Sequence, residues 1–469
     1  MTGTALRLHR QQLGLSQAKL AELSGISQHI LSAFELGKTD LSKYFLAVVS
    51  NALADKESVV TLVSREKRYR EHKYVEVEKL VERVKRAART EGNAEYRRCL
   101  DEMATQHKRN TREMSALSLF SGCGGFSLGF SAAGFFVKGY LELEDYLRKI
   151  YKLNFPDSLE LGSDITEIST SSLEDYRERI GGVDVIIGGP PCQGFSLSGK
   201  RKIDDPRNAL FKHYLRFVDV FRPKLALLEN VRLLTSMKNP EGQLVKDEIC
   251  EEFRKHGYKI GCFEINAKDY GVPQHRERVM FIAVRNDISA MPSLPGKTHG
   301  RLLDIFSSTL PYRTFADACS DLAFIESGEK STDDLHEAVK HPAHVIEWLW
   351  DVPEGCSAHD NEDPNKRPPS GYNTTYKRQI WMEPASTVQT TFGMISGCRN
   401  VHPIATRSLT IREAARIQSL PDSYKFTGNL GAIRTGIGNA VPPLLAYQIA
   451  CHVKNQLNLV EVPRLKIEL

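Results

Sequence analysis

A cysteine stands at the centre of the most distinctive motif in this chain, Gly188-Gly189-Pro190-Pro191-Cys192-Gln193-Gly194-Phe195-Ser196. The apolar run at residues 183–187 is typical of a buried strand, and the Gly-Pro cluster would end that strand abruptly. Ligand sites of open α/β sheets form where strands end in this way. A lone cysteine is more often a buried core residue, but prolines, glutamine, glycine and serine do not build a core. The motif therefore predicts that Cys192 is a nucleophile.

A glycine-rich turn forms a second candidate site. The segment Phe120-Ser121-Gly122-Cys123-Gly124-Gly125 follows an apolar stretch, and its glycines would let a ligand approach backbone N–H groups at a helix start. It lacks the third, correctly spaced glycine of the dinucleotide fingerprint, which argues against NAD. Glu142 follows the next apolar stretch, where a carboxylate can hold ribose hydroxyls, and Asp164 could accept from an exocyclic amine. Taken singly, either carboxylate is more often a surface residue.

Further motifs follow in one order along the chain: Asp205-Pro206-Arg207-Asn208-Ala209-Leu210-Phe211, Glu229-Asn230-Val231, Gln274-His275-Arg276-Glu277-Arg278, Arg412-Glu413-Ala414-Ala415-Arg416-Ile417-Gln418 and Ile437-Gly438-Asn439-Ala440-Val441-Pro442-Pro443. Together with the two sites above, they resemble the motifs of the DNA (cytosine-5)-methyltransferase family in order and spacing. One departure is Ser118, where many members carry Asp. The resemblance implies an α/β, Rossmann-like fold that uses S-adenosylmethionine, with a catalytic domain at residues 115–295 and 401–460.

The resemblance also implies a covalent mechanism for the methylation of cytosine. The Cys192 thiolate would add to position 6 of the base, and a neutral carboxylic acid at Glu229 would donate to N3. Arg276 would contact O2 and hold the base in register with Cys192, while Arg278 would support the site. Two arginines two apart on a strand share one face, so both could point into the cleft. The alternatives are a capping or surface carboxylate at Glu229, and surface ion pairs of the arginines with Glu277.

The methyl donor implied by the resemblance is S-adenosylmethionine, and no metal is expected. Its expected contacts are Phe120, Gly122, Cys123, Gly124, Gly125, Glu142 for the ribose, Asp164 and Ile165 for the adenine, and Pro191, Leu210, Asn439 and Ala440 on the methionine side. The target cytosine would have to leave the duplex stack, because position 6 is hidden inside it. Gln193 and Ser196 are then candidates for the loop that closes over the DNA.

Residues 1–55 have the pattern of a small all-α domain. Short helices are separated by a Gly-containing turn, and Ser27 would cap the last of them, which Gly37 would close. This stretch resembles the phage-repressor (Cro/C1-type) helix-turn-helix family. The residues that would face the major groove of DNA are Gln28, His29 and Ser32. The alternative is a helical bundle used for dimerisation.

Two further regions carry no catalytic motif. Residues 56–114 are charged and have an apolar stripe with helical spacing, which predicts a helical linker. Residues 296–400 are rich in Pro, Gly, His, Asp and aromatic residues, which predicts an irregular inserted lobe. Thr387-Val388 resembles a family marker near the end of the target-recognition region, so this lobe would read the DNA sequence. Basic residues that could reach bases or phosphates there are Lys377, Arg378 and Arg399.

The composition narrows the setting and the partners. The chain has 469 residues, a formal net charge of +5 and nine cysteines without a CxxC pair, which fits neither a disulfide framework nor a zinc site. Without a signal-peptide core or a membrane-length apolar run, a cytoplasmic location is expected. We expect double-stranded DNA as the partner, a cognate restriction endonuclease as a functional counterpart, and a monomer or a dimer through the N-terminal region.

Two other functions are compatible with these motifs. One is methylation of cytosine at position 5 in transfer RNA, because the transfer RNA branch is similar in fold and thiol. The other is a transcriptional regulator in which methylation is secondary. The two roles can also combine, since the N-terminal domain would then repress the gene's own promoter.

Overall fold

The computed structural model describes residues 2–12, 15–24, 26–39, 49, 77–109, 111–191, 210–239, 242–301 and 309–461. The chain divides into two compact units, each assembled from separate stretches of sequence. The sheet unit comprises residues 90–319, 380–394 and 411–469. The lobe unit comprises residues 1–89, 320–379 and 395–410.

The boundaries of these units differ from the expected domain boundaries. Residues 296–319 and 380–394 pack with the sheet unit rather than with the inserted lobe. The charged stretch is not one linker either, because helix α6 (Val77–Arg86) lies in the lobe unit and α7 (Glu91–Arg109) in the sheet unit. Each helix has an apolar stripe that must be buried, and each buries it on its own unit.

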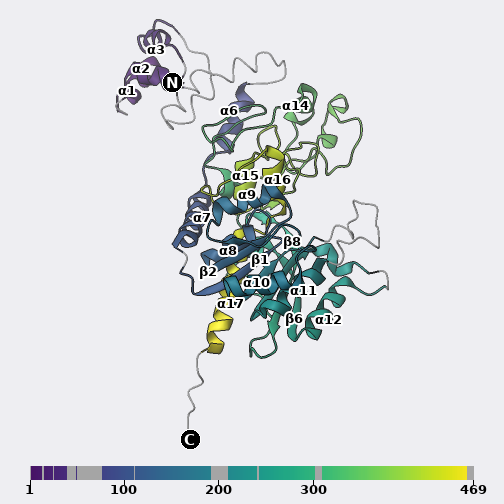
Figure 1. Cartoon of the computed structure of the whole chain (residues 1–469). Coiled ribbons are helices and arrows are strands. Elements are labelled where there is room, and N and C mark those ends of the chain that lie inside the picture. The colour runs from purple at the N-terminus through teal and green to yellow at the C-terminus, as the bar shows by residue number, and fades with distance from the viewer. Residues whose placement is uncertain are drawn as a thin grey trace. The chain divides into compact units, whose positions relative to one another are not determined.

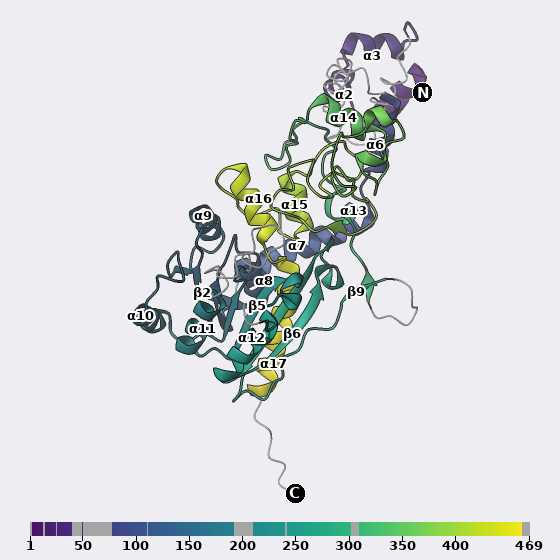
Figure 2. The ribbon, with the colours of Figure 1, turned by 90° about the vertical axis from the view of Figure 1, so that its right-hand side faces the viewer.

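A seven-stranded sheet forms the centre of the sheet unit, in the order β3-β2-β1-β4-β5-β8-β6 (Figures 1 and 2). Its strands are β1 (Met114–Leu119), β2 (Phe135–Leu141), β3 (Leu159–Glu160), β4 (Val185–Gly188), β5 (Leu225–Val231), β6 (Tyr258–Asn266) and β8 (Glu277–Arg285). The strands from β3 to β5 are parallel, whereas β8 is antiparallel to both of its neighbours. The connection from β6 to β8 contains no α-helix, and a parallel pair would need such a crossover.

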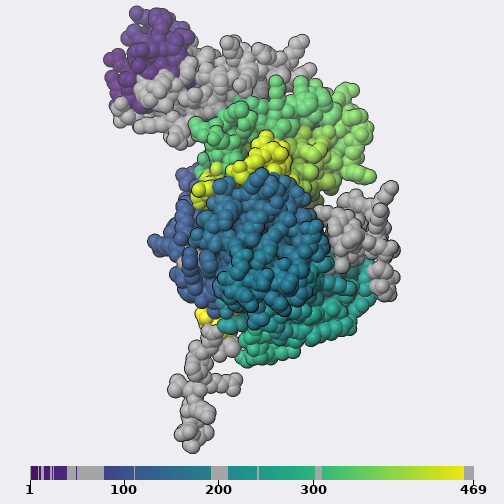
Figure 3. Space-filling model, in the orientation of Figure 1, coloured from purple at the N-terminus to yellow at the C-terminus, as the bar shows by residue number. Residues whose placement is uncertain are grey.

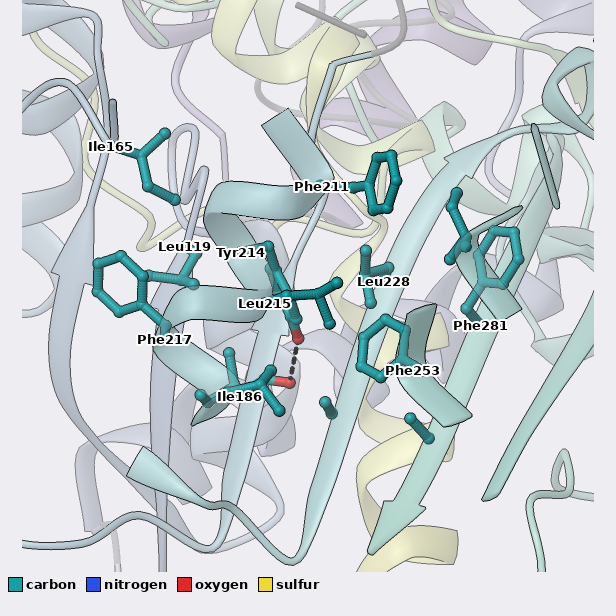
Figure 4. Close-up of a cluster of buried hydrophobic side chains, with 14 of the residues drawn as sticks. Leu119, Ile165, Ile186, Phe211, Tyr214, Leu215, Phe217, Leu228, Phe253 and Phe281 are labelled. Atoms are coloured by element: carbon teal, nitrogen blue, oxygen red, sulfur yellow. Dashed lines mark hydrogen bonds between the residues drawn. The ribbon is translucent and has the colours of Figure 1, made fainter. Parts of the chain in front are cut away.

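The apolar runs of the sequence became central strands because both faces of the sheet are covered. β4 is buried along its whole length, and Ile186 belongs to the main apolar core shown in Figure 4. Tyr214 lies in that core, and its hydroxyl donates to the carbonyl oxygens of Ile186 (2.9 Å) and Leu227 (3.2 Å). Its polar group is thus satisfied inside an apolar environment.

Helices cover the sheet on both sides. Helix α8 (Gly125–Ala132) packs against α7, β2 and α17 (Pro443–Glu461). The core of Figure 4 is closed by α10 (Thr170–Ile180), α11 (Leu210–Phe221) and α12 (Val245–Lys255). The other helices of this unit are α9 (Asp145–Asn154), α13 (Phe315–Cys319), α15 (Ile411–Ile417) and α16 (Leu430–Asn439). In Figure 3, much of the visible surface of this unit is blue and teal.

Shorter elements complete the sheet unit. They are the 3-10 helices η3 (Arg232–Ser236) and η4 (Ala267–Tyr270) and the strands β7 (Gln274–His275), β9 (His299–Gly300), β10 (Leu310–Pro311) and β11 (Ala385–Ser386). Among the described residues, no helix has both the length and the apolar composition that crossing a membrane requires.

The parts of the lobe unit at residues 320–379 and 395–410 contain little regular structure, as their composition predicted. Their elements are α14 (Ala343–Trp350) and the 3-10 helices η5 (Ala358–Asp360) and η6 (Pro364–Lys366). A small apolar cluster that includes Val345, Leu349 and Val401 is their core. Because this core is small, buried polar side chains carry much of the packing around it.

Three helices lie near the start of the chain, within residues 1–89 of the lobe unit: α1 (Gly3–Gln12), α2 (Gln17–Ser24) and α3 (Gln28–Glu35). Ser27 caps α3 by accepting a hydrogen bond from the backbone N–H of Ile30, as predicted. Arg10 of α1 forms a buried ion pair with Glu35 of α3 at 2.7 Å, and Gln17 donates to the same carboxylate. Burial opposes the ionisation of Glu35, but these hydrogen bonds outweigh it and lower the pKa of Glu35.

Candidate functional site

The candidate site lies where the parallel strands β1 and β4 end side by side. Leu119, the last residue of β1, pairs with Gly188, the last residue of β4. From β1 the chain continues to β2 on one side, and from β4 it continues to β5 on the other. Open α/β sheets bind ligands at such switch points. The glycine-rich turn therefore lies beside the segment that leads to Cys192.

The glycine-rich turn has one open side and one packed side. Gly122, with φ +55°, has open space where a side chain would point. A Cβ on Gly125 would instead meet the carbonyl oxygen of Val441 at 2.4 Å. Phe120 has φ 52°, a conformation that residues other than glycine rarely adopt. The backbone around Gly122 is thus shaped to admit a ligand from one side.

Cys123 differs from the other expected cofactor contacts. Its side chain is buried, and Sγ donates to the carbonyl oxygen of Gly436 at 3.2 Å. Burial raises the pKa of this thiol to about 12. The side chain of Cys123 therefore packs into the interior against α16.

Glu142, directly after β2, fixes the glycine-rich turn. Its Oε2 accepts a hydrogen bond from the N–H of Gly122 at 2.7 Å, and its Oε1 accepts one from the N–H of Glu144 at 3.0 Å. The side chain is buried, and burial raises the pKa of its carboxyl group. Each carboxylate oxygen has a further lone pair, so this anchored group can also accept hydroxyl donors.

The remaining cofactor candidates follow the strand ends around this turn. Asp164 is half-buried, and its Oδ1 accepts from the N–H and the hydroxyl of Thr166, whereas Ile165 belongs to the core. The other candidates are the exposed residues Pro191 and Asn439, the buried Ala440, and Leu210, which begins α11 against the core.

Glu229 and Arg278 form an ion pair across neighbouring strands. Nε of Arg278 lies 2.8 Å from Oε1 of Glu229, and their side chains are 14% and 11% exposed. The antiparallel register opposes Arg278 to Val231, which shares a face of β5 with Glu229. A Cβ on Gly189 would lie 3.5 Å from Oε2 of Glu229. The pair therefore lies against the segment that leads to Cys192.

Arg276 lies in a different environment from Arg278. It occupies the break between β7 and β8, so the expectation that the two arginines share a strand face was wrong. Its guanidinium is buried and donates to the carbonyl oxygens of Val388 (3.3 Å) and Gly438 (3.0 Å). Burial, and next the charge of Arg278, lower the pKa of Arg276. This arginine therefore joins backbone segments of the sheet unit.

Two polar residues of the motifs have structural contacts that the sequence did not reveal. Gln274 is fully buried, accepts from the N–H of Val388 at 2.9 Å and donates to Gln418 at 2.6 Å. Asn230 donates to the carbonyl oxygen of Pro190 at 2.9 Å. Their positions inside the motifs were the only signal. Gln274 thus fixes backbone next to the arginines, and Asn230 fixes backbone of the segment that leads to Cys192.

The expected nucleophile and DNA contacts are only partly covered by the structure. Cys192, Gln193 and Ser196 lie outside the described residues. On the N-terminal helices, Gln28 and His29 are exposed and Ser32 is half-buried.

Arg378 was expected to be able to reach bases or phosphates of DNA, but its side chain is buried in the lobe. It is 2% exposed and donates to the carbonyl oxygens of Leu349, His402, Ile404 and Ala405 and to the hydroxyl of Thr406. A guanidinium that is surrounded by protein acceptors cannot reach DNA. Lys377 is half-buried and Arg399 exposed, so these two remain candidates.

Within the described ranges, His, Cys, Asp and Glu side chains do not gather in threes as they would around a metal ion.

Comparison with known proteins gives two family matches. Residues 114–455 match the family of C-5 cytosine-specific DNA methylases, and residues 6–54 match a helix-turn-helix family. Both resemblances read from the motifs are thereby confirmed.

Individual relatives agree with these matches. Type II methyltransferase M1.HphI of Haemophilus parahaemolyticus is 38% identical over 341 residues, which cover 72% of this chain and 86% of the relative. Type II methyltransferase M.DdeI of Desulfomicrobium norvegicum is 34% identical over 400 residues, covering 76% and 92%. The crystal structure of a DNA modification methyltransferase encoded within an E. coli prophage has a TM-score of 0.57 and 26% identity, over 74% of this chain and 100% of that one. The expectation of an α/β methyltransferase fold is therefore confirmed.

Proposed function

Because this chain belongs to the C-5 cytosine-specific DNA methylase family, we propose that it methylates cytosine within a specific double-stranded sequence through a transient bond from Cys192 to position 6. Its enzyme class, a DNA (cytosine-5-)-methyltransferase, follows from the family. Position 5 of cytosine is a weak nucleophile. Addition of the thiolate to position 6 moves an electron pair to position 5, which then takes the methyl group. Loss of the proton from position 5 and of the thiolate restores the ring.

The ion pair of Glu229 and Arg278, next to Gly189, is the observation that carries this proposal. Thiolate addition places negative charge on N3 and O2 of the ring. Arg278 donates to O2, which differs from the expected assignment of that contact to Arg276. Glu229, as a carboxylic acid, donates its proton to N3, and the guanidinium of Arg278 lies against its Oε1. Both groups stabilise charge that appears only during the reaction.

Arg276 acts as a positioning residue in this proposal. Its hydrogen bonds to Val388 and Gly438 hold two chain segments beside the ion pair. Gly438 is followed by Asn439, the candidate for the methionine end of the cofactor.

The methyl group comes from S-adenosylmethionine, which the family implies and which the residues of the turn suit. The open side of Gly122 admits a ligand close to the backbone, and Glu142 beside it accepts ribose hydroxyls. Ile165 offers an apolar contact to the adenine, and Asp164 accepts from its amine. The other contacts assigned to the cofactor are Phe120, the backbone of residues 123–125, Pro191, Leu210, Asn439 and Ala440.

Three sets of residues contact DNA in this proposal. In the catalytic step the cytosine swings out of the duplex, and Gln193 and Ser196 belong to the loop that covers it. The lobe reads the target sequence, with Lys377 and Arg399 as contacts. Gln28, His29 and Ser32 of the helix-turn-helix domain bind the gene's own promoter, which limits expression. A restriction endonuclease of the same specificity is the functional counterpart, as the Type II relatives suggest.

Bisulfite sequencing of DNA from cells that express this chain tests the function and reveals the target together. We expect methylated cytosines at one recurring sequence. The purified protein should methylate duplex DNA and leave transfer RNA unmodified. Activity on transfer RNA alone would overturn the proposal.

A further inference from the structure

Helix α6 is part of the lobe unit although it lies outside both family matches, which cover residues 6–54 and 114–455. Neither family therefore accounts for its place in this protein. Figures 1 and 2 both show α6 beside α14. Leu80 and Arg83 of α6 are buried, so this helix presents both an apolar and a charged side chain to the lobe.

The guanidinium of Arg83 is surrounded by partners from the lobe. Its Nη1 donates to Oε1 of Glu326 at 3.2 Å and to the hydroxyl of Thr406 at 2.9 Å. Its Nη2 donates to the carbonyl oxygen of Trp350, and its Cζ lies 3.7 Å from the centre of the Trp350 ring. A single side chain of α6 thus contacts three separate stretches of the lobe.

Glu326 is the ion-pair partner of this arginine. Its side chain is 2% exposed, and Oε2 accepts from the N–H of Thr406 at 2.6 Å. Thr406 also receives a hydrogen bond from Arg378 at its hydroxyl oxygen, at 2.8 Å. Arg83, Glu326, Arg378 and Thr406 therefore form one buried polar network, and removing one charge would leave the opposite charge buried without its partner.

The network adjoins the candidate DNA contacts of the lobe along the backbone. Arg378 is the neighbour of Lys377 in sequence, and the carbonyl oxygen of Lys377 accepts from the N–H of Val401 at 3.3 Å. The N–H of Arg399 donates to the carbonyl oxygen of Thr374 at 3.0 Å. The positions of Lys377 and Arg399 therefore depend on the backbone that the network holds.

We propose that α6 is a built-in part of the recognition lobe and that Arg83 is a positioning residue for the binding of target DNA. This inference rests on the proposed role of the lobe in reading the DNA sequence. With Arg83 in place, the backbone at residues 377–378 and 399–406 is fixed before DNA arrives. Without Arg83, these segments must become ordered when DNA binds. The free energy that this ordering costs lowers the affinity for DNA.

The test compares Arg83→Ala with Arg86→Ala in the full-length protein. Arg86 lies on the same helix, but its ion pair with Glu354 is half-exposed, so its loss should change little. Steady-state methylation gives KM for the target duplex, KM for S-adenosylmethionine, and kcat. For Arg83→Ala we expect KM for DNA to rise by roughly tenfold or more, with kcat at saturating DNA and KM for S-adenosylmethionine within about twofold of wild type.

A merely structural role would lower the amount of folded enzyme and leave both KM values unchanged. That result, or a parallel loss of kcat, would overturn the inference. If Arg83→Ala does not fold, the pair Arg83→Met with Glu326→Gln removes both charges together, and the same comparison of KM and kcat decides.

Lys377→Ala separates this inference from the proposed role of the lobe. If KM for DNA rises in Lys377→Ala and not in the Arg83 variants, the inference fails alone. If neither rises, the role of the lobe fails as well.

Discussion

Nε of Arg278 lies 2.8 Å from Oε1 of Glu229, across the antiparallel strands β8 and β5. Arg276, in the same motif, donates instead to the carbonyl oxygens of Val388 and Gly438. One arginine is thus paired with a candidate catalytic carboxylate, and the other is surrounded by backbone. Removal of Arg278 and removal of Arg276 should therefore have different effects on the enzyme.

Replacing Arg278 by Ala should lower kcat by about a hundredfold or more, because charge on O2 of the ring would lose its donor. Replacing Arg276 by Ala should chiefly lower the thermal midpoint, because two buried carbonyl oxygens lose their donors. Steady-state kinetics and thermal denaturation of both variants check this difference. A stable Arg276→Ala enzyme without activity, beside an active Arg278→Ala enzyme, would reverse the two roles.

Glu142→Gln should raise KM for S-adenosylmethionine by roughly tenfold and leave KM for DNA near its wild-type value. The amide keeps one acceptor but brings a donor towards the N–H groups of Gly122 and Glu144, which disturbs the turn. Glu144→Gln is the matched control, because Glu144 is exposed and contributes its backbone N–H. Equal KM values for S-adenosylmethionine in Glu142→Gln and Glu144→Gln would exclude Glu142 from the cofactor site.

The helix-turn-helix domain should be separable from methylation. The combined change of Gln28 and His29 to Ala should abolish specific binding to the promoter of this gene in a mobility-shift assay, because both side chains are exposed on α3. Deletion of residues 1–54 should raise expression from that promoter in cells. Unchanged expression, or loss of methylation on deletion, would contradict the assignment of a repressor role.

Acid should destabilise the lobe unit through His341. Burial, and next the charge of Arg407, lower the pKa of His341 to about 4, and its Nε2 accepts from the N–H of Ser408 at 3.1 Å. The unfolded chain binds a proton more tightly than the folded one, so stability is full above about pH 6.5 and falls as the pH drops towards 4. His341→Gln should flatten this part of the pH dependence of the thermal midpoint, whereas His344→Gln, at an exposed histidine, should not. Identical acid profiles for wild type and His341→Gln would refute this explanation.

The strands and the strand-end site could be predicted from the sequence because their signals are local. Apolar runs such as residues 183–187 mark strands that are buried on both faces, and Gly-rich or Gly-Pro segments mark where they end. Glu142 and Glu229 follow apolar runs directly, so their places at the same edge of a parallel sheet follow from the pattern.

The errors concern contacts between distant segments. The break in the strand at residue 276 and the register of β5 with β8 separate Arg276 from Arg278, and neither is encoded in the spacing of the motif. Arg378 is one of the basic residues of the lobe, but its acceptors come from residues 349 and 402–406. The charged segment at residues 56–114 likewise divides between the two units because α6 packs on the lobe unit and α7 on the sheet unit.

The central claim, a transient bond between the sulfur of Cys192 and position 6 of cytosine, has a direct chemical test. DNA copied with 5-fluorodeoxycytidine in place of deoxycytidine should trap that bond in the presence of S-adenosylmethionine, because fluorine at position 5 cannot leave as a proton. We predict a denaturation-resistant adduct with the wild-type protein, mapped to Cys192 by mass spectrometry, and none with Cys192→Ala. An adduct at another cysteine, or methylation of ordinary DNA by Cys192→Ala, would contradict the account.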